Sequence, residues 1–88
     1  MKIKEGFILK EIAGNFVVVP VGENLVDFSS MITTNETGAF LWEKLQNGAT
    51  EEELCSALLG EYEGVSYEDA LSDVKEFVKI LKEKNIVE

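Results

Sequence analysis

Apolar residues in the first third of the chain follow the short period of β-strands. Residues 7–12 and residues 16–19 are rich in β-branched and aromatic side chains, and the turn-forming residues 13–15 separate them. This pattern predicts a β-hairpin. The unbroken apolar run of its second strand is typical of a strand buried on both faces, and Pro20, which has no amide donor, should end the ladder or lie on an exposed side.

A third strand is predicted over residues 25–32. A turn signal at residues 22–24 precedes it, and the pair Ser29 and Ser30 interrupts its apolar residues. Such a segment is typical of a short or bulged strand at the edge of a sheet.

From Asn35 onward the apolar residues recur with the period of an α-helix. Thr34 or Asn35 is the N-cap candidate, and Gly48 marks the end of this short helix. Its apolar residues share one face: Leu41, Trp42 and Leu45.

Two longer helices follow, and each begins at a capping pattern. Thr50 with Glu53 forms a capping box before the second helix, and Ser66 with Asp69 repeats the pattern before the third, which runs to about Lys84. Apolar residues recur in the second helix at Leu54, Cys55, Leu58, Leu59 and Tyr62, and in the third at Ala70, Leu71, Val74, Phe77, Val78 and Leu81.

The element order predicts an α+β fold, with a three-stranded sheet followed by three helices. The chain has 88 residues, 45% of them apolar, which suits one hydrophobic core and hence a single domain over residues 1–88. A sheet this small must bury one face under the helices, and at least one strand edge stays open.

Charge argues against nucleic-acid binding. The net charge is −9, and the chain has no arginine and no lysine cluster, so a phosphate backbone would be repelled. The N-terminal residues are charged, and no apolar run reaches membrane-spanning length. We therefore expect a cytoplasmic protein without a membrane or nucleic-acid partner.

Residues that carry catalysis or hold metals are scarce. There is no histidine, the only cysteine is Cys55, and no glycine-rich phosphate loop occurs. Cys55 lies on the apolar face of the second helix and is expected in the core, as is Trp42. Gly38, in the first turn of a helix, indicates close packing. We expect no enzyme activity, no metal and no cofactor.

Two segments carry more apolar residues than the hydrophobic core requires. The third strand carries apolar residues at an edge, and Ile80 widens the apolar stripe of the third helix. Together they suit a groove in which an extended peptide adds as a strand. Plain core packing and a homodimer formed through the same edge are the alternatives that composition leaves open.

Several segments resemble the PqqD family, named for the small protein D of coenzyme PQQ synthesis. They are Phe16-Val-Val-Val-Pro20, Val26-Asp-Phe28, Ile32-Thr-Thr-Asn-Glu-Thr-Gly-Ala-Phe-Leu-Trp42 and Gly48-Ala-Thr-Glu-Glu-Glu-Leu54. Their order and spacing agree with the family over residues 7–87, and the segment from Asn35 to Trp42 is its most recognisable part. One departure is the extra length between Pro20 and Thr33.

The resemblance implies a winged-helix-like domain that binds the leader of a ribosomally made precursor peptide. The leader adds to the third strand, lies against the third helix, and is presented to a modifying enzyme, often a radical SAM protein. The segment from Asn35 to Trp42 is interpreted as a structural signature. By position, the peptide-binding residues would be Leu25, Val26, Phe28 and Ile32 on the strand and Val74, Phe77, Val78 and Leu81 on the helix.

The winged-helix fold also raises the alternative of a nucleic-acid binder. A recognition helix should be basic, whereas the third helix carries Glu68, Asp69, Asp73 and Glu76 beside its lysines. A dimeric regulatory subunit is the second alternative, and both rank below leader-peptide binding.

Overall fold

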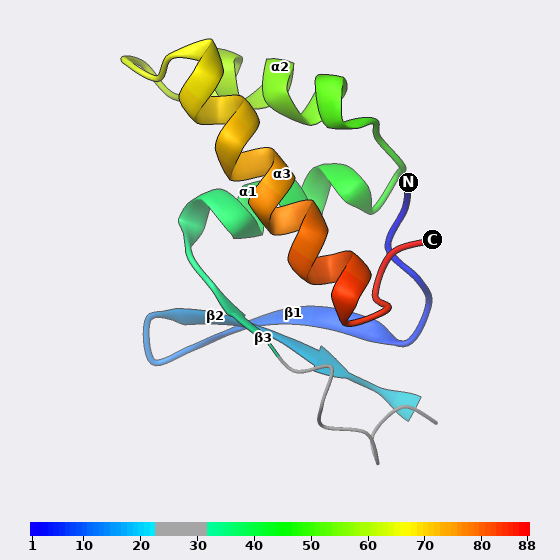
Figure 1. Ribbon diagram of the computed structural model, residues 1–88. Coiled ribbons are helices and arrows are strands. Elements are labelled where there is room, and N and C mark those ends of the chain that lie inside the picture. The colour runs from blue at the N-terminus through cyan, green and yellow to red at the C-terminus, as the bar shows by residue number, and fades with distance from the viewer. Residues whose placement is uncertain (23–31) are drawn as a thin grey trace.

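The computed structural model describes residues 1–22 and 32–88 and consists of a small sheet with three helices on one side (Figure 1). This α+β order of strands followed by helices confirms the predicted fold class. The elements are β1 (Phe7–Ile12), β2 (Asn15–Pro20), β3 (Ile32–Thr34), α1 (Glu36–Leu45), α2 (Glu51–Glu61) and α3 (Tyr67–Glu83).

The strands are antiparallel and lie in the order β1-β2-β3, so β2 is central. Ile12 pairs with Asn15, which leaves a two-residue turn between β1 and β2. Both turn residues have positive φ, 51° at Ala13 and 83° at Gly14, as a turn matching the twist of a hairpin requires. The predicted hairpin is confirmed, and β2 ends at Pro20 as expected.

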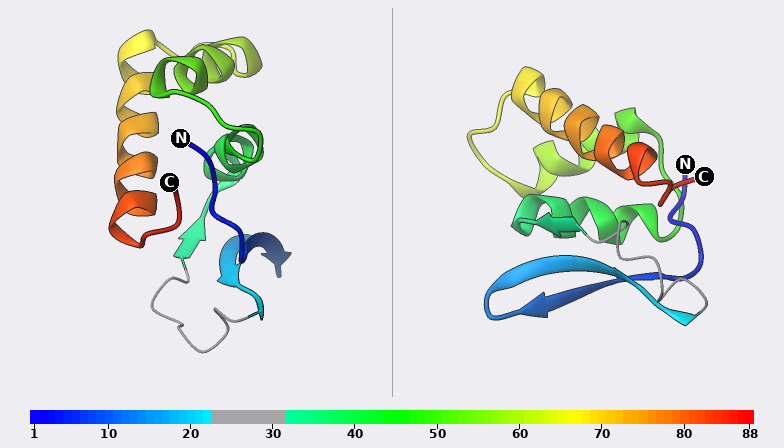
Figure 2. Two further views of the ribbon diagram at one scale, coloured as in Figure 1. Left: turned by 90° about the vertical axis from the view of Figure 1, so that its right-hand side faces the viewer. Right: turned by 60° about the horizontal axis from the view of Figure 1, so that its bottom comes forward.

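The sheet is buried on one face only, because all three helices lie on the same side of it (Figures 1 and 2). Val18 points to the covered face and is fully buried, whereas its neighbours Val17 and Val19 are half-buried. Ile8 pairs with Val19 on the other face and is 37% exposed. The expectation that β2 is buried on both faces is therefore wrong.

Side-chain caps define the start of each helix, as the sequence predicts. The amide of Gly38 donates to Asn35 Oδ1 at 2.9 Å, which identifies Asn35 as the cap of α1. Thr50 and Glu53 form the reciprocal capping box of α2. The amide of Asp69 donates to Ser66 Oγ at 3.1 Å at the start of α3. These bonds satisfy amides that have no partner within a helix.

The end of α1 and the burial of one residue of α2 differ from the prediction, whereas the end of α3 agrees with it. α1 stops at Leu45, three residues before Gly48, which has a φ of 88° and lies in the loop that follows. Leu59 was counted on the apolar face of α2, but it is exposed. α3 ends at Glu83 with Lys84 as its C-cap, as predicted.

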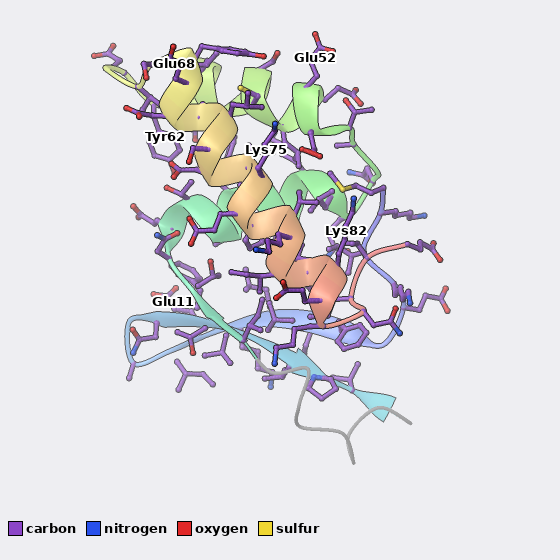
Figure 3. All side chains as sticks on the ribbon, viewed as in Figure 1. Glu11, Glu52, Tyr62, Glu68, Lys75 and Lys82 are labelled. Atoms are coloured by element: carbon purple, nitrogen blue, oxygen red, sulfur yellow. The ribbon has the colours of Figure 1, made fainter. Side chains whose placement is uncertain are left out.

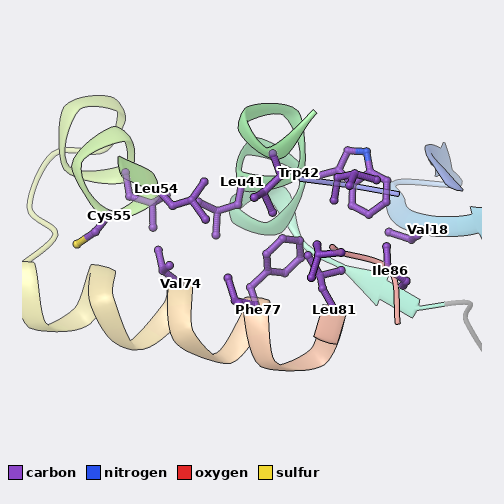
Figure 4. Close-up of a cluster of buried hydrophobic side chains, with 14 of the residues drawn as sticks. Val18, Leu41, Trp42, Leu54, Cys55, Val74, Phe77, Leu81 and Ile86 are labelled. Atoms are coloured by element: carbon purple, nitrogen blue, oxygen red, sulfur yellow. The ribbon is translucent and has the colours of Figure 1, made fainter. Parts of the chain in front are cut away.

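One hydrophobic core lies between α3, α1, α2 and the covered face of the sheet (Figure 4). Trp42 and Cys55 both belong to it, at 3% and 1% exposure, which confirms their interpretation as core residues. The sulfur of Cys55 lies 4.0 Å from the carbonyl oxygen of Tyr67. α3 contributes its whole inner stripe: Ala70, Val74, Phe77, Val78 and Leu81.

The two ends of the chain are joined side by side (Figure 2). Ile3 forms a β-bridge with Val87, and the amide of Lys4 donates to the Ile86 carbonyl at 2.8 Å. Nearby, the Ala49 amide donates to the Met1 carbonyl at 2.8 Å. Ile86 is fully buried, so this terminal pair closes one side of the core.

None of the helices in residues 1–22 and 32–88 is long and apolar enough to cross a membrane.

Truncation of Ile86 should test how much the terminal pair contributes. We expect Ile86→Ala to lower the free energy of unfolding by about 2–5 kcal/mol, because it leaves a cavity in the core. Ile12→Ala is the matched control, since Ile12 is 53% exposed; its effect should stay within about 0.5 kcal/mol. Urea denaturation measures both, and equal effects of the two substitutions would contradict this role of the C-terminal residues.

Candidate functional site

A groove of about 190 Å³ lies where the end of β3, the start of α1 and one flank of α3 meet. Its floor is apolar and its rim is polar, with hydroxyl, amide and carboxylate groups. The lining residues are Thr34, Asn35, Thr37, Gly38, Leu41, Asp73, Glu76, Phe77 and Ile80.

The groove begins at the edge of the sheet. β3 pairs with β2 on one side through residues 32–34, and no strand within the described part of the chain pairs with its other side. An open edge presents backbone amide and carbonyl groups to an incoming chain. Thr34 belongs both to this strand and to the groove lining, so the edge and the groove are continuous.

The structure describes one of the predicted strand residues. Ile32 is half-buried, packs against the core and pairs with Val18. Leu25, Val26 and Phe28 lie outside the described residues.

The predicted peptide-binding residues of α3 are more deeply buried than residues of a binding surface usually are. Val74, Val78 and Leu81 are at most 2% exposed and point from α3 into the core (Figure 4 labels Val74 and Leu81). Phe77 is 7% exposed and also lines the groove. In this conformation only Phe77 of the four adjoins the groove, because the same apolar stripe packs α3 against the rest of the domain. Peptide contact at these positions stays a prediction.

The neighbouring strip of α3 forms the groove wall, and sequence reasoning did not select it. Asp73, Glu76 and Ile80 follow one another at helical spacing and, with Phe77, line the groove. Ile80 had been noted as an extension of the apolar stripe. The sequence does not distinguish Asp73 and Glu76 as groove residues, because exposed acidic residues on a helix are ordinary in a chain with this net charge.

The opposite wall comes from the start of α1, in the segment that had been interpreted as a structural signature. Asn35 both caps the helix and lines the groove. A Cβ atom added to Gly38 would overlap Thr34 Oγ1 and lie 2.9 Å from Thr34 Cβ. The glycine therefore lets the helix start pack closely on β3, which confirms that close internal packing is its role.

A second depression, larger but more open, lies on the other side of the domain between β1 and α1. Its volume is about 510 Å³, and aromatic residues such as Phe7, Phe40 and Trp42 contribute to its lining. We place the candidate site at the first groove, because that groove is more enclosed and adjoins the open edge of β3.

Nothing in the described ranges, 1–22 and 32–88, gathers three or more metal-binding side chains. The groove lining contains no histidine or cysteine, and its chemistry is that of a binding surface: apolar contacts, hydroxyl and amide groups, and two carboxylates.

Comparison with known proteins identifies the family of this chain. The sequence model described as coenzyme PQQ synthesis protein D (PqqD) matches residues 7–87. A search of curated proteins gave no match.

Two solved structures share the fold. TbiB1 in complex with the TbiA(beta) leader peptide is 24% identical, with a TM-score of 0.75, over 100% of this chain and 95% of that one. Lasso peptide synthetase B1 complexed with the leader peptide is 21% identical, with a TM-score of 0.71, over 97% of this chain and 93% of that one.

The contact between Gly38 and Thr34 predicts opposite effects of two glycine substitutions. Gly60 lies inside α2 with open space around its Cα, so Gly60→Ala should raise the free energy of unfolding by about 0.5–1 kcal/mol. Gly38→Ala should instead lower it by about 1 kcal/mol, because overlap with Thr34 outweighs the gain in helix propensity. Thermal or urea unfolding measures both.

A Thr34→Ala background provides the control for this prediction. There the overlap with Thr34 Oγ1 is removed and only the 2.9 Å approach to the Cβ atom of residue 34 remains, so the destabilisation by Gly38→Ala should become clearly smaller. Stabilisation by Gly38→Ala in the otherwise unchanged protein would contradict the close contact.

Proposed function

Because this chain belongs to the PqqD family, we propose that it binds the leader segment of a ribosomally made precursor peptide and presents the rest to a separate modifying enzyme. The observation that carries the proposal is the open edge of β3 running into the groove beside α3. The two solved structures of the same fold, both determined with a leader peptide, support it.

In this proposal the leader adds as a further strand to the edge of β3. Main-chain hydrogen bonds then give affinity without reading sequence, and the side chains of every second leader residue point toward the groove and give specificity. Ile32 and, outside the described residues, Leu25, Val26 and Phe28 would form the edge. On α3 the peptide would meet Phe77 and Ile80 first.

A preformed groove favours binding energetically. Thr34 and Gly38 are held together by close packing, and α3 is fixed by its buried stripe, so little of the groove needs ordering when a peptide arrives. The described groove residues therefore lose little conformational freedom on binding, which lowers the free-energy cost of association.

We propose that residues 1–88 act as one recognition domain and that the chemistry belongs to the partner enzyme, of which a radical SAM protein is our first candidate. The groove lining supports a binding role, since it offers apolar and hydrogen-bonding groups and no nucleophile activated by a base.

Truncation of Ile80 tests the location of the binding surface. The ligand is the leader of a short precursor encoded beside this gene, titrated into isotope-labelled protein. Ile80→Ala should weaken binding roughly tenfold through lost apolar contact. Amide NMR should show saturating shifts at residues 32–34 and at the groove residues of α1 and α3.

Ile8→Ala is the matched control, because Ile8 is partly exposed but lies on β1, away from the groove. Its affinity should stay within about twofold of the unchanged protein. Shifts confined to β1 and the depression beside α1 would move the binding site there, and no shifts with any leader would end the leader-binding proposal.

Charge should affect the rate of association. With a net charge of −9, the domain should attract a leader or an enzyme surface that carries lysine and arginine. Raising salt from about 0.05 to 0.5 M should slow association severalfold, because the screening length shortens. Stopped-flow mixing measures this rate, and a rate independent of salt would exclude electrostatic steering.

A further inference from the structure

Two carboxylates of α3, Asp73 and Glu76, lie on the opposite flank of the helix from three of its lysines. Lys75, Lys79 and Lys82 lie on the flank near the start of α2, beside Glu51 and Glu83. Figure 3 shows Lys75 and Lys82 projecting on the same side of α3. The opposite flank carries Asp73 and Glu76, and both line the groove.

The two carboxylates lie three residues apart on α3, so they are neighbours on the helix surface and repel each other. All eight lysines of the chain fall within the described residues, yet no ion pair or side-chain hydrogen bond involves Asp73 or Glu76 there. Among residues 1–22 and 32–88, the negative charge at the groove rim therefore has no neutralising partner.

Below this rim the groove is apolar. Leu41 and Phe77 form its buried floor, and Ile80 lies one turn of helix beyond Glu76. A cavity of about 190 Å³ with this lining matches the dual character of a lysine or arginine side chain, whose aliphatic stem packs on apolar surface while its charged end stays at a polar rim.

We propose that this groove is a specificity pocket for one lysine or arginine side chain of the leader peptide. The stem lies over Phe77 and Ile80, and the cationic group sits between the carboxylates of Asp73 and Glu76. Hydroxyl groups of Thr34 and Thr37 on the opposite wall are available as additional acceptors. The inference rests on the proposed binding of a leader at β3, and it names the residue class that the site selects.

Charge complementarity favours this occupant over the other side chains that an extended peptide offers. An acidic side chain would add a third negative charge beside two like charges. A purely apolar side chain would contact the floor and leave the carboxylates partly desolvated without a partner, which carries a free-energy cost. A lysine or arginine side chain can contact the apolar floor with its stem and the carboxylates at the rim with its charged end.

The test combines changes in the protein with changes in the peptide. The probe is the leader of the precursor encoded beside this gene, with each lysine or arginine replaced in turn by norleucine, which keeps an aliphatic stem and removes the charge. The protein variant is Asp73→Asn with Glu76→Gln. Isothermal titration or fluorescence anisotropy gives the affinities at fixed salt.

Glu68→Gln with Glu83→Gln is the matched control. It changes the net charge by the same amount on the same helix, but neither residue lines the groove. It therefore reproduces any effect of total charge on binding and leaves the pocket unchanged. Unfolding by urea checks that all variants keep the fold.

We expect one basic position of the leader at which norleucine weakens binding roughly five- to tenfold in the unchanged and control proteins. In the Asp73→Asn, Glu76→Gln variant the same replacement should change affinity by less than about twofold. If the leader binds but no position is coupled to these carboxylates in this way, the pocket inference is wrong and leader binding stands. If the unchanged protein binds no leader, both proposals fail.

Discussion

Burial of one face of α3 is the interaction on which the rest of the structure depends. Val74, Val78 and Leu81 pack into the same core as residues of α1, α2 and the sheet, so this face joins all parts of the domain. Because these side chains are used in the core, they are not available to a partner. The flank with Asp73, Glu76 and Ile80 faces β3 and α1 and becomes a groove wall.

Local chemistry explains why most of the fold could be predicted from the sequence. A cap depends on a side chain and an amide three residues away, so Asn35, Thr50 and Ser66 marked the helix starts correctly. The hairpin turn is equally local. Burial of a strand depends on what covers each face of the sheet, and the apolar run of β2 carries no information on this. Val17 and Val19 on its second face are only half-buried, and all three helices lie on the other side.

The candidate site could be predicted only in part, for a related reason. The sequence indicated a strand over residues 25–32, of which β3 contains only Ile32 within the described residues, and on α3 it selected the most apolar stripe. Helical periodicity identifies the face that enters the core, and the residues of α3 that line the groove lie beside that face. Which flank faces β3 depends on how α3 crosses the sheet, and only the packed structure gives this orientation. Phe77, at the border between stripe and flank, is the one selected residue of α3 that adjoins the groove.

The pairing of the chain ends has a consequence for how the domain can be combined with others. Hydrogen bonds join residues 2–4 to residues 86–88, so both ends leave the domain from one corner (Figure 2). A domain of this kind can be placed within a surface loop of another polypeptide without stretching that loop, since its entry and exit points nearly coincide. The architecture thus suits covalent insertion into another polypeptide.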